Sequence, residues 1–279
     1  MRRILIFSII AIGLTLPAFA QTPARGRGQG QAPEPELPFR LGGSNGPAVA
    51  KPDPNRPAPK LADGTVDLSG VWTGGGDAAV GRLLKPGELN TLLTPAGKKI
   101  LATRTANPGS DPYFACMPGG PLRMTGGFAW RLVQHPTVNS THIFLIQEGN
   151  AHSYRQIFMN AKHPEDPSPT WYGHSIGRWE GETLVVDTIG VNDKFWLDQA
   201  GTPHSEKLHM VERWSRPNYT TLRRDVRLED PEMFTKPIDI TFTAKLSTPE
   251  SEIFEYFCIE NEQFGARTLA DPTVKPLGR

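Results

Sequence analysis

His174 and Asp187 are the two residues whose types and spacing offer the clearest chemistry. They lie on the two sides of Glu180-Gly181, a sequence typical of a two-residue hairpin turn. With that pair as the loop, His174 lies directly opposite Asp187, and opposed side chains have Cβ atoms about 5 Å apart. A carboxylate at that distance would orient the imidazole and raise its pKa, as a general base requires. The spacing therefore predicts a His174–Asp187 dyad.

Two further residues of the hairpin would support such a dyad. Arg178 shares a face with His174 in this register, and Tyr172 comes just before the strand. Either side chain would stabilise negative charge that develops on a substrate. The alternative is a structural cross-strand pair without catalysis. Both interpretations depend on the register, because a shift of one residue turns alternate side chains to the other face.

A polar loop follows the hairpin, and loops at the mouth of a barrel commonly carry function. It would either contact a ligand or simply be solvated. Including the flanking strands, the predicted ligand-binding residues are Trp171, Asn192, Asp198, His204, His209 and Glu212. A metal ion held by the last four is the alternative. Their spacing matches neither a helical HExxH pattern nor an established zinc signature, so no metal is predicted.

The alternation of strand-like runs with turn residues predicts a mainly β protein. Runs rich in Val, Ile, Thr, Phe and Tyr are typical of an antiparallel meander. They lie at Val71 and at 131–134, 142–147, 153–160, 174–179, 183–189, 208–215, 221–228, 238–246 and 253–260. A sheet of about ten strands must protect its edges, and closure into a barrel removes them. We therefore expect a lipocalin-like barrel or a strongly coiled sandwich.

One short helix is predicted near residues 94–105. Thr94 suits the N-cap, Pro95 suits the first helical position, and Ile100 and Leu101 follow at helical spacing. We expect this helix to lie near one end of the barrel.

The chain contains two cysteines, Cys116 and Cys258. An even number of cysteines in an exported protein predicts a disulfide first. Closing so long a loop contributes about 5 kcal/mol in the chain-entropy model. The alternative is a reactive thiol or a metal ligand. It has less support, because neither cysteine has a base or a CxxC partner near it in sequence.

The N-terminus predicts export. Arg2 and Arg3 precede an apolar run from Ile4 to Leu16, and the following Ala18-Phe19-Ala20 is typical of a signal-peptidase site. The run has 13 residues, whereas a membrane span needs about 20. We expect a signal peptide over 1–20, a flexible Pro/Gly-rich leader over 21–60, one β domain over 61–262 and an irregular tail over 263–279. The expected location is periplasmic or secreted.

Charge and motifs weigh against several partners and cofactors. With 30 Lys+Arg and 29 Asp+Glu, the chain has no basic excess for a nucleic acid or an anionic membrane. The mature sequence contains no GxSxG elbow, Walker A loop, Rossmann fingerprint or c-type haem motif, so no cofactor is predicted. Charged residues gather around Pro217-Asn218, which indicates either a solvated face with cross-strand ion pairs or an anion-binding wall.

Two segments carry a family resemblance. TWYGHSIGRWEGETLVVDT and LDQAGTPHSEKLHMVERW are similar to segments of a family of exported bacterial proteins that has no established activity. The resemblance covers roughly residues 67–261. It departs from the family motif at Glu182, where Asp is usual, and at Val191, where Phe is usual. It implies secretion and a shared β fold, and it assigns no catalytic residue.

Three functions fit these features. The first is a secreted small-molecule-binding barrel with an apolar cavity. The second is a cofactor-independent lyase, isomerase or hydrolase that uses the His174–Asp187 dyad. The third is an envelope-associated structural or interaction module with an apolar patch on its surface. For the first two, we expect a small-molecule ligand or substrate, no nucleic acid, and no membrane span after signal cleavage.

Overall fold

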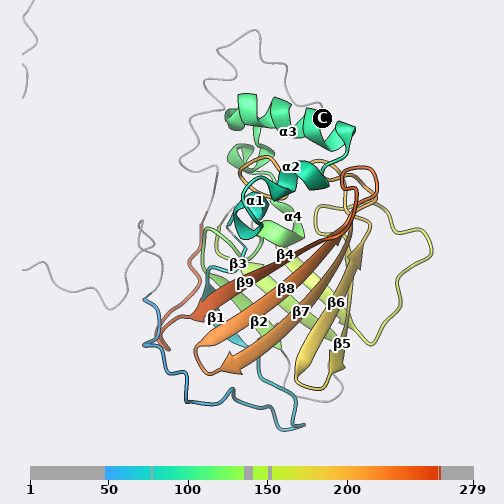
Figure 1. The fold of residues 1–279 in the computed structure, drawn as a ribbon. Helices are drawn as coiled ribbons and strands as arrows, with labels where there is room; N and C mark the ends of the chain where they lie inside the picture. The colour runs from blue at the N-terminus through green and yellow to red at the C-terminus, as the bar shows by residue number, and fades with distance from the viewer. Residues whose placement is uncertain (1–47, 77, 135–140, 150–152, 257, 259–279) are drawn as a thin grey trace, which may run out of the picture. The chain divides into compact units, whose positions relative to one another are not determined.

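Nine strands form one closed barrel in the computed structural model, which describes residues 48–76, 78–134, 141–149, 153–256 and 258 (Figure 1). The predicted mainly β barrel is thus confirmed. The strands are β1 (Gly70–Thr73), β2 (Trp130–Gln134), β3 (His142–Gln147), β4 (Tyr154–Met159), β5 (His174–Glu180), β6 (Thr183–Ile189), β7 (His209–Asn218), β8 (Thr221–Glu229) and β9 (Ile238–Leu246).

Strand pairing departs from the predicted meander at two places. Every neighbouring pair is antiparallel except β4 and β5, which run parallel. The expectation of purely antiparallel pairs is wrong here, because residues 160–173 are long enough to form the crossover that a parallel pair needs. The run predicted at 253–260 is not a strand at its described residues, 253–256 and 258. Because β1 already pairs with β9, the closed barrel offers that run no free edge.

The helices of the described chain gather at one end of the barrel, away from the β5–β6 and β7–β8 turns (Figure 1). They are α1 (Val80–Leu83), α2 (Glu88–Leu92), α3 (Pro95–Ala106) and α4 (Gly120–Arg123), with 3₁₀ turns at Pro108–Ser110 and Pro112–Ala115. The predicted helix is α3. The Thr94 hydroxyl accepts a hydrogen bond from the Gly97 amide at 3.0 Å, as expected for an N-cap. No helix of the described residues has the length and apolarity to cross a membrane.

Two apolar clusters hold these parts together. Inside the barrel, the ring of Trp130 lies 6.3 Å from Trp72 and 5.9 Å from Trp214 between centroids. All three side chains are fully buried. The second cluster joins the helices to the strand ends, with Leu93 and Phe234 among its members. The barrel is therefore filled at its centre and covered by helices at one end.

The chain before the barrel is partly attached to it. Residues 48–60, the last part of the predicted leader, hydrogen-bond to the strands at Ala50, whose amide donates to the Leu246 carbonyl at 2.8 Å. The guanidinium of Arg56 lies 3.4 Å above the Tyr219 ring. The predicted signal peptide, the rest of the leader and the predicted tail over 263–279 lie outside the described residues.

Cys116 and Cys258 form a disulfide, as predicted. The bond joins the chain before α4 to the chain after β9, across 142 positions of sequence. It therefore links the helical end of the barrel to the segment that follows the last strand.

Candidate functional site

The β5–β6 hairpin turns one residue later than predicted. Glu180 pairs with Thr183, so the loop consists of Gly181 and Glu182. Gly181, the first loop residue, has a φ of 61°, which glycine adopts without steric cost. Moving the loop by one residue shifts the partner of each β5 residue by two positions along β6, so His174 lies opposite Ile189. The predicted direct opposition of His174 and Asp187 is wrong, but a shift of two keeps both side chains on one face.

The ring of His163 bridges His174 and Asp187. Its Nε2 lies 3.1 Å from Oδ1 of Asp187, and its Nδ1 lies 2.9 Å from Nδ1 of His174. His163 belongs to the crossover between β4 and β5. His163 is not among the site residues predicted from the sequence, because a histidine before Pro164 resembles an ordinary turn residue. Only the parallel pairing of β4 and β5 brings this segment over the hairpin.

A third histidine completes the group. Nε2 of His209, the first residue of β7, lies 3.0 Å from the same Oδ1 of Asp187. Its Nδ1 lies 3.5 Å from Oε2 of Glu229 on β8. We call His163, His174, Asp187, His209 and Glu229 the histidine cluster. It lies on the outer wall, where β5 and β7 begin, at the helical end of the barrel (Figure 1).

The cluster drives two histidine pKa values in opposite directions. Hydrogen bonding to Asp187, supported by Glu229, raises the pKa of His209. Burial, followed by the neighbouring His163, lowers the pKa of His174. The hydrogen bond from His209 lowers the pKa of Asp187, and His163 adds to this effect. Relative to free side chains, the arrangement therefore favours the ionised form of Asp187, the neutral form of His174 and the protonated form of His209.

Hydrogen-bond chemistry orders the protons along the cluster. An ionised carboxylate only accepts, so Nε2 of His163 carries the proton that it donates to Asp187. In its neutral form, His163 then accepts at Nδ1 from the Nδ1–H of His174. With its proton on Nδ1, His174 has its lone pair on Nε2. These proton positions are inferred from the donors and acceptors in the cluster. An imidazole held in that tautomer can take up a proton.

Two residues predicted to assist the dyad lie elsewhere. Arg178 is exposed near the hairpin turn, where its Nη2 donates to Oε1 of Glu180 at 2.7 Å. Tyr172 packs against the apolar cluster inside the barrel, and burial raises its pKa to about 12. The structure therefore does not bring either side chain to the histidine cluster.

The predicted loop residues hold the loop itself. Asp198 accepts from the Val80 amide at 2.7 Å and from the Thr202 hydroxyl at 2.6 Å. His204 is buried, which lowers its pKa, and its Nε2 lies 2.9 Å from the Phe195 carbonyl. Separately, Asn192 accepts from the Lys194 amide at 3.1 Å, while Trp171 packs against the apolar cluster at the helical end. These contacts give the residues structural roles, whereas His209 joins the histidine cluster.

Glu212 lies inside the barrel, between two arginines. Arg224 donates to its Oε1 at 2.7 Å, and Arg155 donates to its Oε2. Although burial acts to raise the pKa of Glu212, the two guanidinium groups hold it below its usual value. Arg155 also donates to Ser175 Oγ at 3.1 Å and Thr188 Oγ1 at 2.8 Å. This network joins β5 and β6 directly behind the histidine cluster.

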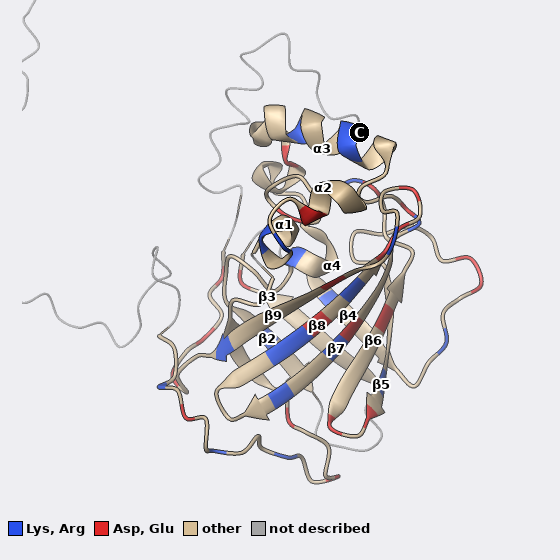
Figure 2. Cartoon of the chain, in the orientation of Figure 1, with Lys and Arg blue, Asp and Glu red and all other residues tan. Residues whose placement is uncertain are grey.

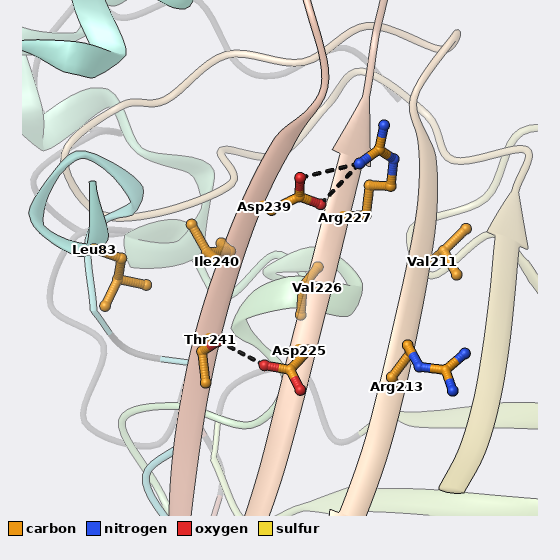
Figure 3. A pocket seen from close by; sticks show the side chains of 9 residues that line it. All are labelled: Leu83, Val211, Arg213, Asp225, Val226, Arg227, Asp239, Ile240 and Thr241. Atoms are coloured by element: carbon orange, nitrogen blue, oxygen red, sulfur yellow. Dashed lines mark hydrogen bonds and ion pairs between the residues drawn. The ribbon is translucent and has the colours of Figure 1, made fainter. Parts of the chain in front are cut away.

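A hollow of about 400 Å³ lies on the outer wall of β7, β8 and β9 (Figure 3). The charges along it are paired, since Arg227 donates to Asp239 at 3.0 Å and Arg223 donates to Asp225 at 2.7 Å. Basic and acidic residues alternate along β8 (Figure 2). This is the arrangement of a solvated wall with ion pairs, one of the two alternatives that the sequence left open.

A second hollow, of about 340 Å³, lies on β3 and β4 and is lined by Phe144, Ile146, Gln147, Ser153 and Tyr154. In the part of the chain that the structure describes, no group of three or more His, Cys, Asp or Glu side chains is arranged to hold a metal ion.

The fold and the site define a closed β-barrel with a charged core and a histidine cluster on its outer wall. Neither a family model nor a curated protein nor a solved structure matches the chain. Its function is therefore inferred from the chemistry of the site.

Proposed function

We propose that this protein is an enzyme of the general acid–base type, with His174 as the base and His209 as the acid. One observation carries the proposal: Asp187 binds His209 directly and reaches His174 through the ring of His163. Histidines whose pKa values are moved apart by their surroundings suit the two roles, because one is neutral while the other is protonated.

Each residue has a defined part in such a reaction. Nε2 of His174 takes a proton from the substrate or from a water molecule. His163, held by the carboxylate of Asp187, orients the ring of His174 through the contact between their Nδ1 atoms. The protonated His209 keeps its Nε2–H on Asp187 and gives its Nδ1 proton, which otherwise faces Glu229 at 3.5 Å, to the group that leaves or to the atom that gains negative charge. Hydrolysis, elimination and isomerisation all need this pair of transfers, each worth about 10²–10⁴-fold in rate.

A secreted small-molecule-binding barrel is the second candidate. The hollow on β3 and β4 favours ligand binding, because three of its five lining residues are apolar or aromatic. The described interior of the barrel holds three tryptophans and the Arg155–Glu212–Arg224 group instead. An apolar ligand is therefore more readily accommodated on the wall than inside. An envelope-associated interaction module would use the same exposed surface.

The enzyme proposal is tested by the pH dependence of a reaction and by replacing His174. With 4-nitrophenyl acetate as the substrate, the rate should depend on pH as a bell-shaped curve. As the pH is raised, the rate should increase below about pH 6.5, where His174 loses its proton, and decrease above about pH 6.5, where His209 loses its proton. His174→Ala should lower the rate about 10²–10⁴-fold. Arg178→Ala, on the same strand but remote from the cluster, is the matched control and should leave it unchanged.

Histidine titration by NMR tests the same assignment without a substrate. The ring of His174 should titrate below about pH 6.5 and that of His209 above it. Titration in the reverse order would contradict the acid and base roles, as would equal rates for wild type and His174→Ala.

A further inference from the structure

The outer wall of β3 and β4 is unusually apolar. Along these strands Phe144, Ile146, Tyr154 and Phe158 occupy positions that alternate with buried ones. Ile146 is 39% exposed and Tyr154 is 58% exposed. Wall positions of a barrel that face water are normally polar. The apolar side chains of this wall therefore indicate a surface that binds something.

The hollow on this wall differs from the hollow on β7–β9 in its charge. Its lining of Phe144, Ile146, Gln147, Ser153 and Tyr154 contains no charged side chain. The lining of the other hollow includes Arg213, Asp225, Arg227 and Asp239. Its volume of about 340 Å³ lies within the range of sites for small molecules. The lining therefore favours an uncharged, apolar occupant.

A row of ring contacts connects the hollow to the histidine cluster. The ring of Phe144 lies 5.8 Å from His142, which lies 5.1 Å from Phe158. The ring of Phe158 is stacked on His174, with centroids 4.8 Å apart and planes inclined by 10°. The base of the proposed reaction thus lies at the end of a row of ring contacts that begins with Phe144 in the hollow.

We propose that this surface binds the substrate, and that the substrate is a small uncharged molecule with an aromatic or other apolar body. The body lies in the hollow, against Phe144, Ile146 and Tyr154. The reactive end extends past Phe158 to Nε2 of His174. The reaction at His174 rests on the proposed function. Binding of the apolar body in the hollow is inferred independently, from the apolar side chains of the β3–β4 wall.

Fluorescence of N-phenyl-1-naphthylamine, a neutral aromatic probe, tests the surface. Emission should rise saturably when the probe binds the full-length protein. Ile146→Glu and Tyr154→Glu should each weaken binding about tenfold or more, because a carboxylate must lose water against the apolar probe. Thr241→Glu, in the hollow on β7–β9, is the matched control and should stay within about twofold of wild type. All three positions are on the surface, and circular dichroism checks that the variants fold.

Separate outcomes overturn the surface and the proposed function. Absence of saturable binding, or equal weakening by Thr241→Glu, would overturn the surface. The surface would also be overturned if the protein self-associates in sedimentation, Ile146→Glu abolishes that association and the probe does not bind. The wall would then bind a second copy of the chain instead of a small molecule. His174→Ala should keep the affinity for the probe within about twofold. Probe binding in the hollow without any activity dependent on His174 would overturn the enzyme proposal alone.

Discussion

Asp187 lies one diagonal step from His174 across the β5–β6 pair, and the ring of His163 occupies the space between them. The three side chains come from two strands and a crossover, so their alignment depends on the path of the chain between β4 and β5. His209 approaches Asp187 from the other side. One carboxylate thereby organises two histidines with opposite pKa shifts.

Replacing His163 should release His174 from this arrangement. His163→Ala removes the neighbouring imidazole and part of the burial that together lower the pKa of His174. The pKa of His174 should then rise toward its ordinary value of about 6.5, which NMR titration of the ring would measure. Arg178→Ala is the control and should leave it unchanged. An unaltered His174 titration in His163→Ala would show that the two rings are not coupled.

His209 should make stability depend on pH in a defined direction. Its pKa is raised in the folded state, so its contribution is fully present below the unfolded value of about 6.5 and is lost as the pH rises through the folded value. His209→Ala should therefore reduce the free energy of unfolding by on the order of 1 kcal/mol near pH 5 and much less near pH 9. Urea denaturation at both pH values measures the difference. A loss that is the same at both would contradict the coupling.

The charged group inside the barrel should be sensitive to the loss of its carboxylate. Glu212→Gln leaves Arg155 and Arg224 buried without a compensating charge, which should cost about 3–5 kcal/mol in chemical denaturation. Asp239→Asn breaks an exposed ion pair with Arg227 and should leave stability nearly unchanged, because solvent screens that pair. Similar losses in the two variants would mean that burial does not govern the strength of these pairs.

Two glycines of the hairpin offer a matched comparison. Gly173 and Gly181 have φ angles of 66° and 61°, so alanine is strained at both. A Cβ on Gly173 would lie 2.5 Å from the Ile189 carbonyl oxygen, whereas a Cβ on Gly181 would have nothing within 4 Å. Gly173→Ala should therefore destabilise the protein by about 1–3 kcal/mol more than Gly181→Ala. It should also shift the NMR signals of the adjacent His174, and equal effects in both measurements would contradict this.

Much of the fold could be predicted because its signals are local. Alternating apolar residues indicated nearly every strand, since side chains on a strand project to opposite faces in turn. Thr94 and Pro95 marked the start of α3 through their own backbone and side-chain chemistry. Because the chain contains two cysteines, an intramolecular disulfide could form only between Cys116 and Cys258.

The candidate site could be predicted only in part. Parity alone placed His174 and Asp187 on one face, and an error of two residues in the register left that face unchanged. His163 could not be predicted, because no local signal shows that β4 and β5 run parallel. Glu212 was expected to contact a ligand, but a glutamate within an alternating strand does not reveal which arginines will enclose it.

The amino-acid sequence by itself determined nearly all of the segments that become strands, which faces their side chains share and which cysteines pair. These features follow from the chain's own periodicity and composition. Only the tertiary structure decided that His163 joins His174 to Asp187, that His209 binds the same carboxylate, and that aromatic rings lead to them across the outer wall. Such contacts join residues distant in sequence, and barrel closure and the crossover determine which of them meet.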